Sequence, residues 1–381
     1  MKKLLIASAV SAAFAVPGVA FAQAKPPAVP TLDKVLEASG ISVSGYMDVA
    51  YTYANKNIET GFSDRVFDSQ NNSFGLHQFG LTVAKQPKEG FGGLVNLTVG
   101  KDAQVIHSFP ESNPLATPPT ATNQTSMFDV TQAFMQYATG SLTVIAGKYA
   151  TMHGTEVIAS TGNTNFSRSI LFGAVPFTHT GVRATWALSD QLSLMAGVNN
   201  GWDQLTDANK GKTIELGGTW NPIKPFTITA SGMSGKEPTT TTTDGTRTSL
   251  NIVASYTIID PLTVGLEYLS VSQDNVGGVG TKQKYDGEAL YVTYMITPKL
   301  RGVLRLESFN DKDGFHFGLG TPATAAKYKE ATVTVSYLVN DSFEARVEAR
   351  SDQATKAVFT DSTGATGKTL MTGALQGLYK F

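Results

Sequence analysis

The stretch "DSFEARVEARSD" (341–352) decides the fold, because apolar and charged residues alternate along it. Every second residue from 343 to 349 is apolar, and the residues between them are charged: Glu344, Arg346, Glu348 and Arg350. A period of two places the two sets on opposite faces of a strand, whereas a helix at 3.6 residues per turn would mix them. The stretch therefore predicts a β-strand with one apolar and one charged face.

The same alternation recurs from Ile41 to the end of the chain, for example in "TSLNIVASYTI" (248–258) and "PLTVGLEYLS" (261–270). Most segments are long enough for a tilted membrane strand, which needs about 9–11 residues. We count about sixteen of them: 41–54, 72–85, 91–102, 127–138, 141–149, 177–188, 191–202, 212–221, 224–233, 247–258, 261–272, 285–296, 299–310, 327–338, 341–351 and 369–381.

The connections alternate between short turns such as "LSDQ" (188–191) and long polar loops such as "SGKEPTTTTTDGT" (234–246). An even strand count with short turns at one end and long loops at the other is the layout of a transmembrane barrel. A soluble β-sandwich or propeller also has many short strands. However, the charges of Arg346 and Glu348 lie in mid-strand, where a soluble core would be apolar.

Aromatic residues gather near the strand ends on the apolar face, as in the interfacial girdles of membrane barrels. These residues are Trp186, Trp220, Tyr256, Tyr268, Tyr294, Tyr337 and Tyr379. The sequence thus predicts an all-β fold over 41–381: a transmembrane antiparallel β-barrel of about 16 strands with short periplasmic turns and long extracellular loops.

The stretch "MKKLLIASAVSAAFAVPGVAFAQA" (1–24) has the basic start, apolar run and small-x-small ending of a signal peptide. Cleavage is expected between Ala22 and Gln23, so residues 1–22 would be removed. A membrane anchor is the alternative, but the apolar run is shorter than the roughly 20 residues that span a bilayer. Residues 23–40 are predicted to form a periplasmic linker with a short helix from Thr31 to Ala38; a pore plug is the alternative.

Composition excludes several classes of function. The formal net charge of −1 argues against nucleic-acid binding, and the absence of cysteine excludes disulfides and thiolate metal sites. The five histidines show no ligand spacing, and no nucleophile elbow or phosphate-binding loop occurs. "NGWDQLTDANKGKTIE" (200–215) only loosely resembles a calcium loop, and we interpret it as a turn with Asx hydrogen bonds. No enzyme, metal or cofactor is expected.

A barrel of sixteen strands is wide enough for an aqueous channel. Assigning each strand's apolar face to lipid directs the following charges into the lumen: Arg183, Glu215, Glu267, Arg301, Arg305, Glu307, Glu344, Arg346, Glu348 and Arg350. Such charges could select solutes through a transverse field. Alternatively, they could only solvate the wall and pair with each other, as in ordinary porin lumens.

The longest connection with apolar content is "YATMHGTEVIASTGNTNFSRSILFGAVPF" (149–177). Loops of this length are usually functional. We predict that residues 150–176 fold into the barrel and narrow it, with Lys148, Glu156 and Arg168 near the constriction; a cap on neighbouring loops is the alternative. The phase of Lys148 is ambiguous, because three apolar residues share its parity: Leu142, Val144 and Ala146.

The chain ends on "GALQGLYKF" (373–381), an alternating stretch whose final residue is Phe381. Tyr379 and Phe381 share the predicted lipid face, where aromatic side chains anchor a strand at the membrane interface. We expect this last strand to close the barrel against the first.

Four stretches resemble the putative β-barrel porin-2 family, the OmpL-like outer-membrane porins of Gram-negative bacteria. They are "SGYMDVAYTYANKN" (44–57), "QNNSFGLHQFGL" (70–81), "EVIASTGNTNFSRSILFGAVPFTHTGVRATWALSDQLSLMAGVNNGWD" (156–203) and "GKTIELGGTWNP" (211–222). The resemblance covers nearly the whole mature chain. It implies a passive pore in the bacterial outer membrane without catalytic residues, cofactor or defined substrate. It also implies that the terminal Tyr379 and Phe381 are an assembly signal.

The predicted function is passive diffusion of small polar solutes or ions through a water-filled barrel. One alternative is a substrate-specific channel, which lumen aromatics such as Tyr46 and Phe134 would favour; another is a structural or adhesive barrel with a closed lumen. The expected partners are outer-membrane lipid, the outer-membrane assembly machinery and the solutes themselves. The size of the chain is compatible with a homotrimer.

Overall fold

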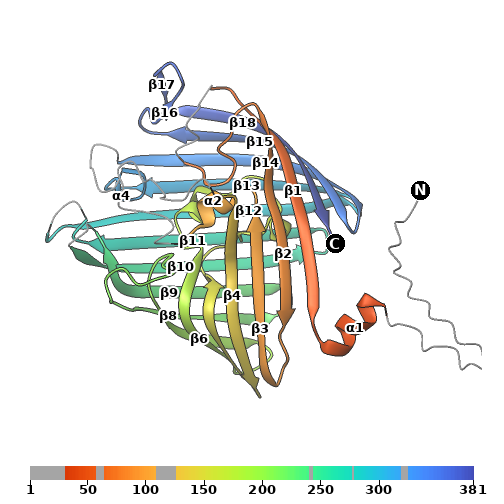
Figure 1. Ribbon diagram of the computed structural model, residues 1–381. Helices are drawn as coiled ribbons and strands as arrows, with labels where there is room; N and C mark the ends of the chain where they lie inside the picture. Colours follow the sequence, from red (N-terminus) through yellow and green to blue (C-terminus); the bar gives the residue numbers. More distant parts are fainter. Residues whose placement is uncertain (1–30, 57–63, 109–125, 240–242, 277–278, 319–324) are drawn as a thin grey trace, which may run out of the picture.

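Sixteen antiparallel strands form one closed ring in the computed structural model (Figure 1), which confirms the predicted all-β barrel. The structure describes residues 31–56, 64–108, 126–239, 243–276, 279–318 and 325–381. The predicted signal peptide and its cleavage between Ala22 and Gln23 lie outside these residues.

The barrel strands follow one another around the ring, and each pairs with its neighbours in sequence. They are β1 (Ser42–Ala54), β2 (Ser73–Lys85), β3 (Gly90–Val99), β4 (Phe128–Thr139), β5 (Leu142–Ala150), β6 (Thr178–Ala187), β7 (Leu192–Asn199), β8 (Thr213–Ile223), β9 (Phe226–Pro238), β10 (Asp244–Ile259), β11 (Leu262–Asp274), β12 (Lys282–Thr297), β13 (Leu300–Asp311), β14 (Ala326–Asn340), β15 (Phe343–Ala354) and β18 (Thr369–Lys380).

Smaller elements lie before β1 and in the connections between strands. They are α1 (Leu32–Ser39), α2 (Ala103–Ile106), the 3-10 turn η1 (Ser160–Gly162), α3 (Ile170–Gly173), α4 (Phe315–Gly318) and the hairpin of β16 (Phe359–Thr360) with β17 (Thr366–Gly367). The strand predicted over 91–102 ends earlier, at Val99, because the chain turns there towards α2. The strand predicted over 224–233 continues to Pro238, because the "SGKEP" part of the following loop also pairs with β10.

The end of the chain closes the ring. Strand β18 pairs with both β15 and β1, and the backbone groups of Gly45 and Phe381 exchange two hydrogen bonds of 2.9 Å. The Phe381 ring covers Gly45 so closely that a Cβ there would lie 2.4 Å from the ring. Glycine at position 45 therefore makes room for the terminal aromatic.

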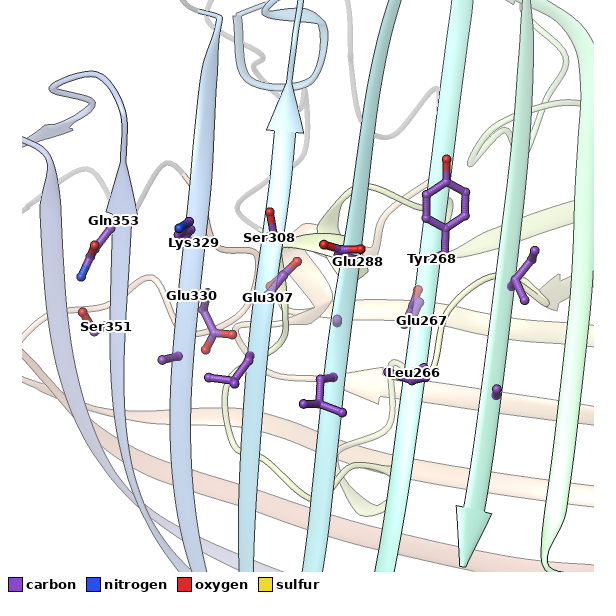
Figure 2. A pocket seen from close by; sticks show the side chains of 16 residues that line it. Leu266, Glu267, Tyr268, Glu288, Glu307, Ser308, Lys329, Glu330, Ser351 and Gln353 are labelled. Carbon is purple, nitrogen blue, oxygen red and sulfur yellow. The ribbon is translucent and has the colours of Figure 1, made fainter.

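The outer face of the barrel is apolar and ends in a polar row. All seven aromatic residues predicted for the girdles are exposed on it. Figure 2 shows the row crossing neighbouring strands above Leu266, and strand register pairs its members in turn: Tyr268, Glu288, Ser308, Lys329 and Gln353. The row borders a hollow of about 760 Å³ on the outer face. We interpret it as the upper edge of the lipid-facing band.

Helix α1 corresponds to the helix expected from Thr31 to Ala38, and it ends at Gly40, whose φ of 66° only glycine adopts easily. Figure 1 shows α1 outside the ring of strands, beside the start of β1, so this helix does not plug the lumen. Among the described residues, no helix has the length and apolar character needed to cross a bilayer.

Candidate functional site

The connection between β5 and β6 (residues 151–177) lies inside the ring and reaches opposite walls. The Gly154 N–H donates to Asn251 Oδ1 of β10 over 2.9 Å, and Gln78 Nε2 of β2 donates to the Ile158 carbonyl oxygen over 2.9 Å. The ring order β2–β1–β18–β15–β14–β13–β12–β11–β10 separates these two strands by eight of sixteen steps. Only a segment that crosses the lumen can bond to both.

Three glutamates of the wall hold this connection by its backbone. Glu348 accepts the N–H groups of Phe166 and Ser167 at 2.7 and 2.9 Å. Glu307 accepts the N–H groups of Ile170 at 2.8 Å and Leu171 at 2.6 Å. Glu267 accepts the Thr155 N–H at 2.9 Å. Hydrogen bonds to a charged group contribute about 1.5–3 kcal/mol each, so these three carboxylates are strong anchors.

Arg305 on β13 joins the same connection to the wall. Its guanidinium is fully buried and lies 2.6 Å from Glu156 Oε1 of the loop and 3.2 Å from Glu330 Oε2 of β14. It also donates to the Ser167 carbonyl oxygen over 2.7 Å. Because Arg305 keeps Glu330 as a partner, removing Glu156 should cost less than the roughly 3–5 kcal/mol of a buried pair broken completely.

The other predicted lumen arginines also have carboxylate partners. Arg183 bonds Glu215 through two nitrogens, at 3.0 and 2.8 Å. Glu344 accepts from both Arg301 and Arg346. Arg350 lies 2.8 Å from Asp352 and also donates to the Arg168 carbonyl oxygen. The five arginines thus pair with carboxylates of the wall. This agrees with the alternative expectation that lumen charges pair with each other.

Arg168 was predicted to lie near the constriction as a charge, but its side chain is turned into the loop. Its guanidinium donates to the carbonyl oxygens of Phe166, Ile158 and Val157 over 2.9–3.1 Å. It is 2% exposed and lies over the rings of Phe67 and Phe172. Arg168 therefore stabilises the shape of the loop and presents no charge to water.

Lys148 was expected near the constriction together with Glu156 and Arg168, but it lies apart from them. It is buried, with Nζ 2.9 Å from the Val130 carbonyl oxygen and 3.4 Å from Asp129 of β4. Whether Lys148 faces the lumen or the lipid is hard to predict from sequence, because Gly147 has a φ of 137° and interrupts the regular alternation of β5. Lys148 consequently contributes to the β4–β5 wall.

Apolar packing fills part of the lumen beside the loop. Ile170 and Leu171 of α3 are buried in a cluster with Tyr285 and Phe309 of the wall. We predicted few lumen aromatics, Tyr46 and Phe134 among them. Five more lie on inward-facing strand positions, most of them beside an inward charge: Tyr149, Tyr285, Tyr291, Phe309 and Tyr328.

The connection between β1 and β2 packs onto the same segment. Arg65 bonds Asp68 over 2.5 Å and also bonds Asp352 of β15, while Phe67 packs against Phe172 with ring centroids 5.4 Å apart. Burial raises the pKa of the neighbouring Asp64 carboxyl to about 7; the charge of Asp352 adds to the rise, and Arg65 opposes it. The β1–β2 and β5–β6 connections therefore pack against each other inside the barrel.

A second part of the wall carries hydroxyl groups and no charges. Inward positions towards the short turns are half-buried threonine and serine residues on β6 to β12: Thr185, Ser193, Thr219, Thr229, Thr257, Thr263 and Thr293. Several bond each other, for example Thr219 with Thr229 at 3.0 Å and Thr257 with Thr263 at 3.0 Å. The same strands carry charges further along, such as the Arg183–Glu215 pair, so the hydroxyls form a neutral band near the short turns.

The histidine and carboxylate side chains of the described residues do not gather into a metal site. These residues contain no group of three or more His, Asp or Glu side chains that could hold a metal ion. His153 uses both ring nitrogens to bond Ser231 at 2.8 Å and Ser249 at 2.9 Å. In the stretch compared with a calcium loop, Asp207 Oδ1 accepts the N–H groups of Asn209 and Lys210, which are the Asx hydrogen bonds expected there.

Comparison with known proteins gives one family and a group of similar folds. A family model described as "Putative beta-barrel porin-2, OmpL-like" matches residues 40–381. No curated protein matches the chain.

Three solved structures illustrate the fold. The chain is similar to the anion-selective porin from Comamonas acidovorans, with TM-score 0.63, 9% identity, and 90% of this chain and 99% of that chain covered. It is also similar to OprB of Pseudomonas putida, with TM-score 0.60, 12% identity, and 91% of this chain and 96% of that chain covered. The trimer form of in-vitro folded OmpT of Vibrio cholerae has TM-score 0.59 and 13% identity, with 90% of this chain and 99% of that chain covered. At these identities the likeness shows the fold alone.

Proposed function

This chain belongs to the Putative beta-barrel porin-2, OmpL-like family and is a porin of the bacterial outer membrane, and we propose that it passes small polar solutes or ions by passive diffusion. The route is a water-filled lumen narrowed by the 150–176 loop. No chemical step and no cofactor take part.

One observation carries this proposal: a loop crosses the lumen and is fixed at both ends of its span. Gln78 holds it on one side, and Glu267, Glu307 and Glu348 hold it on the other. A segment anchored by buried ionic hydrogen bonds keeps a fixed distance from the facing wall, and the pore size follows from that distance.

The route passes the band of hydroxyl groups near the short turns. The loop bonds to strands from β9 to β15, and the apolar cluster around Leu171 and Phe309 fills space beside it. The threonine and serine side chains of β6 to β12 are half-buried, and their hydroxyls offer hydrogen bonds to water and solute without a fixed charge.

Liposome swelling tests the function. Vesicles that contain the purified protein are expected to swell in small sugars and amino acids, with a rate that falls steeply as solute mass increases. Protein-free vesicles should not swell. Vesicles that bind a surface partner but show no solute flux would establish the adhesive, closed-lumen alternative instead.

Ion preference is expected to be weak and towards cations. The five lumen arginines each pair with a carboxylate, and Arg168 bonds only carbonyl oxygens, whereas the three carboxylates of Glu267, Glu307 and Glu348 form hydrogen bonds only with neutral donors. Most fixed charge therefore cancels, and a small negative excess remains. The reversal potential under a KCl gradient measures this; a strong anion preference would contradict the charge assignment.

Two partners complete the proposal. The apolar outer face is bound by membrane lipid, and the terminal Tyr379 and Phe381 are read by the outer-membrane assembly machinery. A homotrimer is the expected assembly, since OmpT of similar fold has a trimer form.

A further inference from the structure

The first half of the lumen loop crosses the barrel, and its second half returns along the wall. Residues 154–158, the crossing segment, run from Asn251 of β10 to Gln78 of β2. The chain then returns along β15 and β13, whose glutamates hold residues 166–171. The crossing segment therefore has the returning chain on one side and the open half of the ring, β3 to β8, on the other.

Val157 is the residue of the crossing segment whose side chain stays exposed. It is 45% exposed, whereas its neighbours Glu156 and Ile158 are buried. Within residues 151–177, all of which the structure describes, the other exposed residues are Thr161 and Gly162. Because the segment lies inside a closed ring of strands, the exposed surface of Val157 faces the lumen.

Hydrogen bonds to its backbone fix the position of Val157. Asn163 Oδ1 accepts the Val157 N–H at 2.9 Å, and Asn163 Nδ2 donates to the Val157 carbonyl oxygen over 2.8 Å. Arg168 Nε donates to the same oxygen over 3.1 Å. The side chain packs over Gly162, where a Cβ would lie 2.5 Å from Val157 Cγ2. Since valine is also stiff at χ1, its methyl groups keep one place in the lumen.

The charges on both sides of this edge are turned away from it. Glu156 bonds Arg305 over 2.6 Å, and Arg168 bonds carbonyl oxygens within the loop. The charged residues of strands β3 to β8 form two buried pairs, Lys148 with Asp129 and Arg183 with Glu215. The narrowed part of the lumen is thus bordered by an apolar side chain on one side and by compensated charges on the other.

We propose that Val157 is the pore-facing edge of the loop, with Thr161 beside it, and that the constriction is uncharged and sorts solutes by size. This inference rests on the proposed function and deepens it, because it names the side chain that meets the solute. An apolar edge offers neither a counter-charge nor a hydrogen bond, so a solute that fits is not held there.

The test introduces a single thiol, because the chain contains no cysteine. Planar-bilayer currents of intact Val157→Cys are recorded while a cationic trimethylammonium-ethyl or an anionic sulfonatoethyl methanethiosulfonate is added. Both reagents lengthen the side chain and should lower the current in steps. The cationic reagent should shift the reversal potential in a KCl gradient towards anions, and the anionic reagent towards cations. The change in permeability ratio should reach at most roughly fivefold, the effect of a unit charge about 4 Å from an ion in water.

The control is Val279→Cys, at an 85% exposed position beyond the last paired residues of β11 and β12. It should take up both reagents, as the mass of the intact protein shows, without a change in current. If Val157→Cys does not form barrels, Thr161→Cys carries the same test.

A thiol in the loop that stays unmodified, or one whose modification leaves current and reversal potential unchanged, would overturn the assignment of the edge. The porin function would then stand, because the wild-type current supports it independently. A wild-type barrel without any current would overturn the proposed function as well.

Discussion

Deletion of residues 155–170 should raise the single-channel conductance on the order of twofold or more, because the segment crosses the lumen of a barrel wide enough for a channel. The barrel itself should still form, since its sixteen strands are joined by an unbroken backbone ladder. Planar-bilayer recordings of wild type and deletion measure the change. An unchanged conductance would mean that the loop does not limit the pore.

A point variant refines this prediction. Glu348→Gln keeps the size of the side chain but removes the charge that binds the N–H groups of Phe166 and Ser167. Each of the two bonds should weaken by about 1 kcal/mol, the difference between charged and neutral hydrogen bonds. We expect more frequent openings to the deletion's conductance level. Glu288→Gln on the outer face is the matched control and should record like the wild type.

Removal of Phe381 should lower the yield of assembled barrel on the order of tenfold, with little effect on the conductance of barrels that do assemble. Two backbone hydrogen bonds to Gly45 are lost, each contributing about 0.5–1.5 kcal/mol, together with the terminal ring. The yield is measured as heat-modifiable protein in outer-membrane fractions.

Phe381→Ala separates the two contributions, because it keeps the backbone pairing with Gly45 and removes only the ring. If the aromatic is the assembly signal, this variant should be as deficient as the truncation, and Phe381→Tyr should assemble normally. Normal assembly of the truncated chain would show that Phe381 is only an interfacial anchor, with no part in recognition.

The barrel could be predicted from sequence because a strand in a membrane barrel has only two environments, lipid and lumen. Alternation along 341–351 and 261–272 therefore identifies both the strands and their faces, and the exposed Tyr337 and buried Arg350 lie as predicted. Boundaries shifted where a loop extended the pairing, as at Pro238, or where the chain left the barrel early, as at Val99.

The contacts of the loop were harder to predict, for a physical reason. Glu307 and Glu348 bind backbone N–H groups, which every residue except proline carries. No side-chain pattern in the loop sequence therefore predicts these hydrogen bonds. Arg168 has the same difficulty, since its partners are carbonyl oxygens. The inward aromatics could have been found: Phe309 shares the parity of Glu307, and Tyr328 that of Glu330.

The backbone anchoring of the lumen loop has an evolutionary consequence. Because Glu267, Glu307 and Glu348 recognise the main chain, residues 155–171 can exchange many side chains without losing these attachments. Through these three glutamates the wall binds the backbone of the loop, whatever side chains the loop carries at these positions. Substitutions at loop positions other than the packed Glu156, Arg168 and Leu171 should therefore change the chemistry of the lumen without removing these attachments.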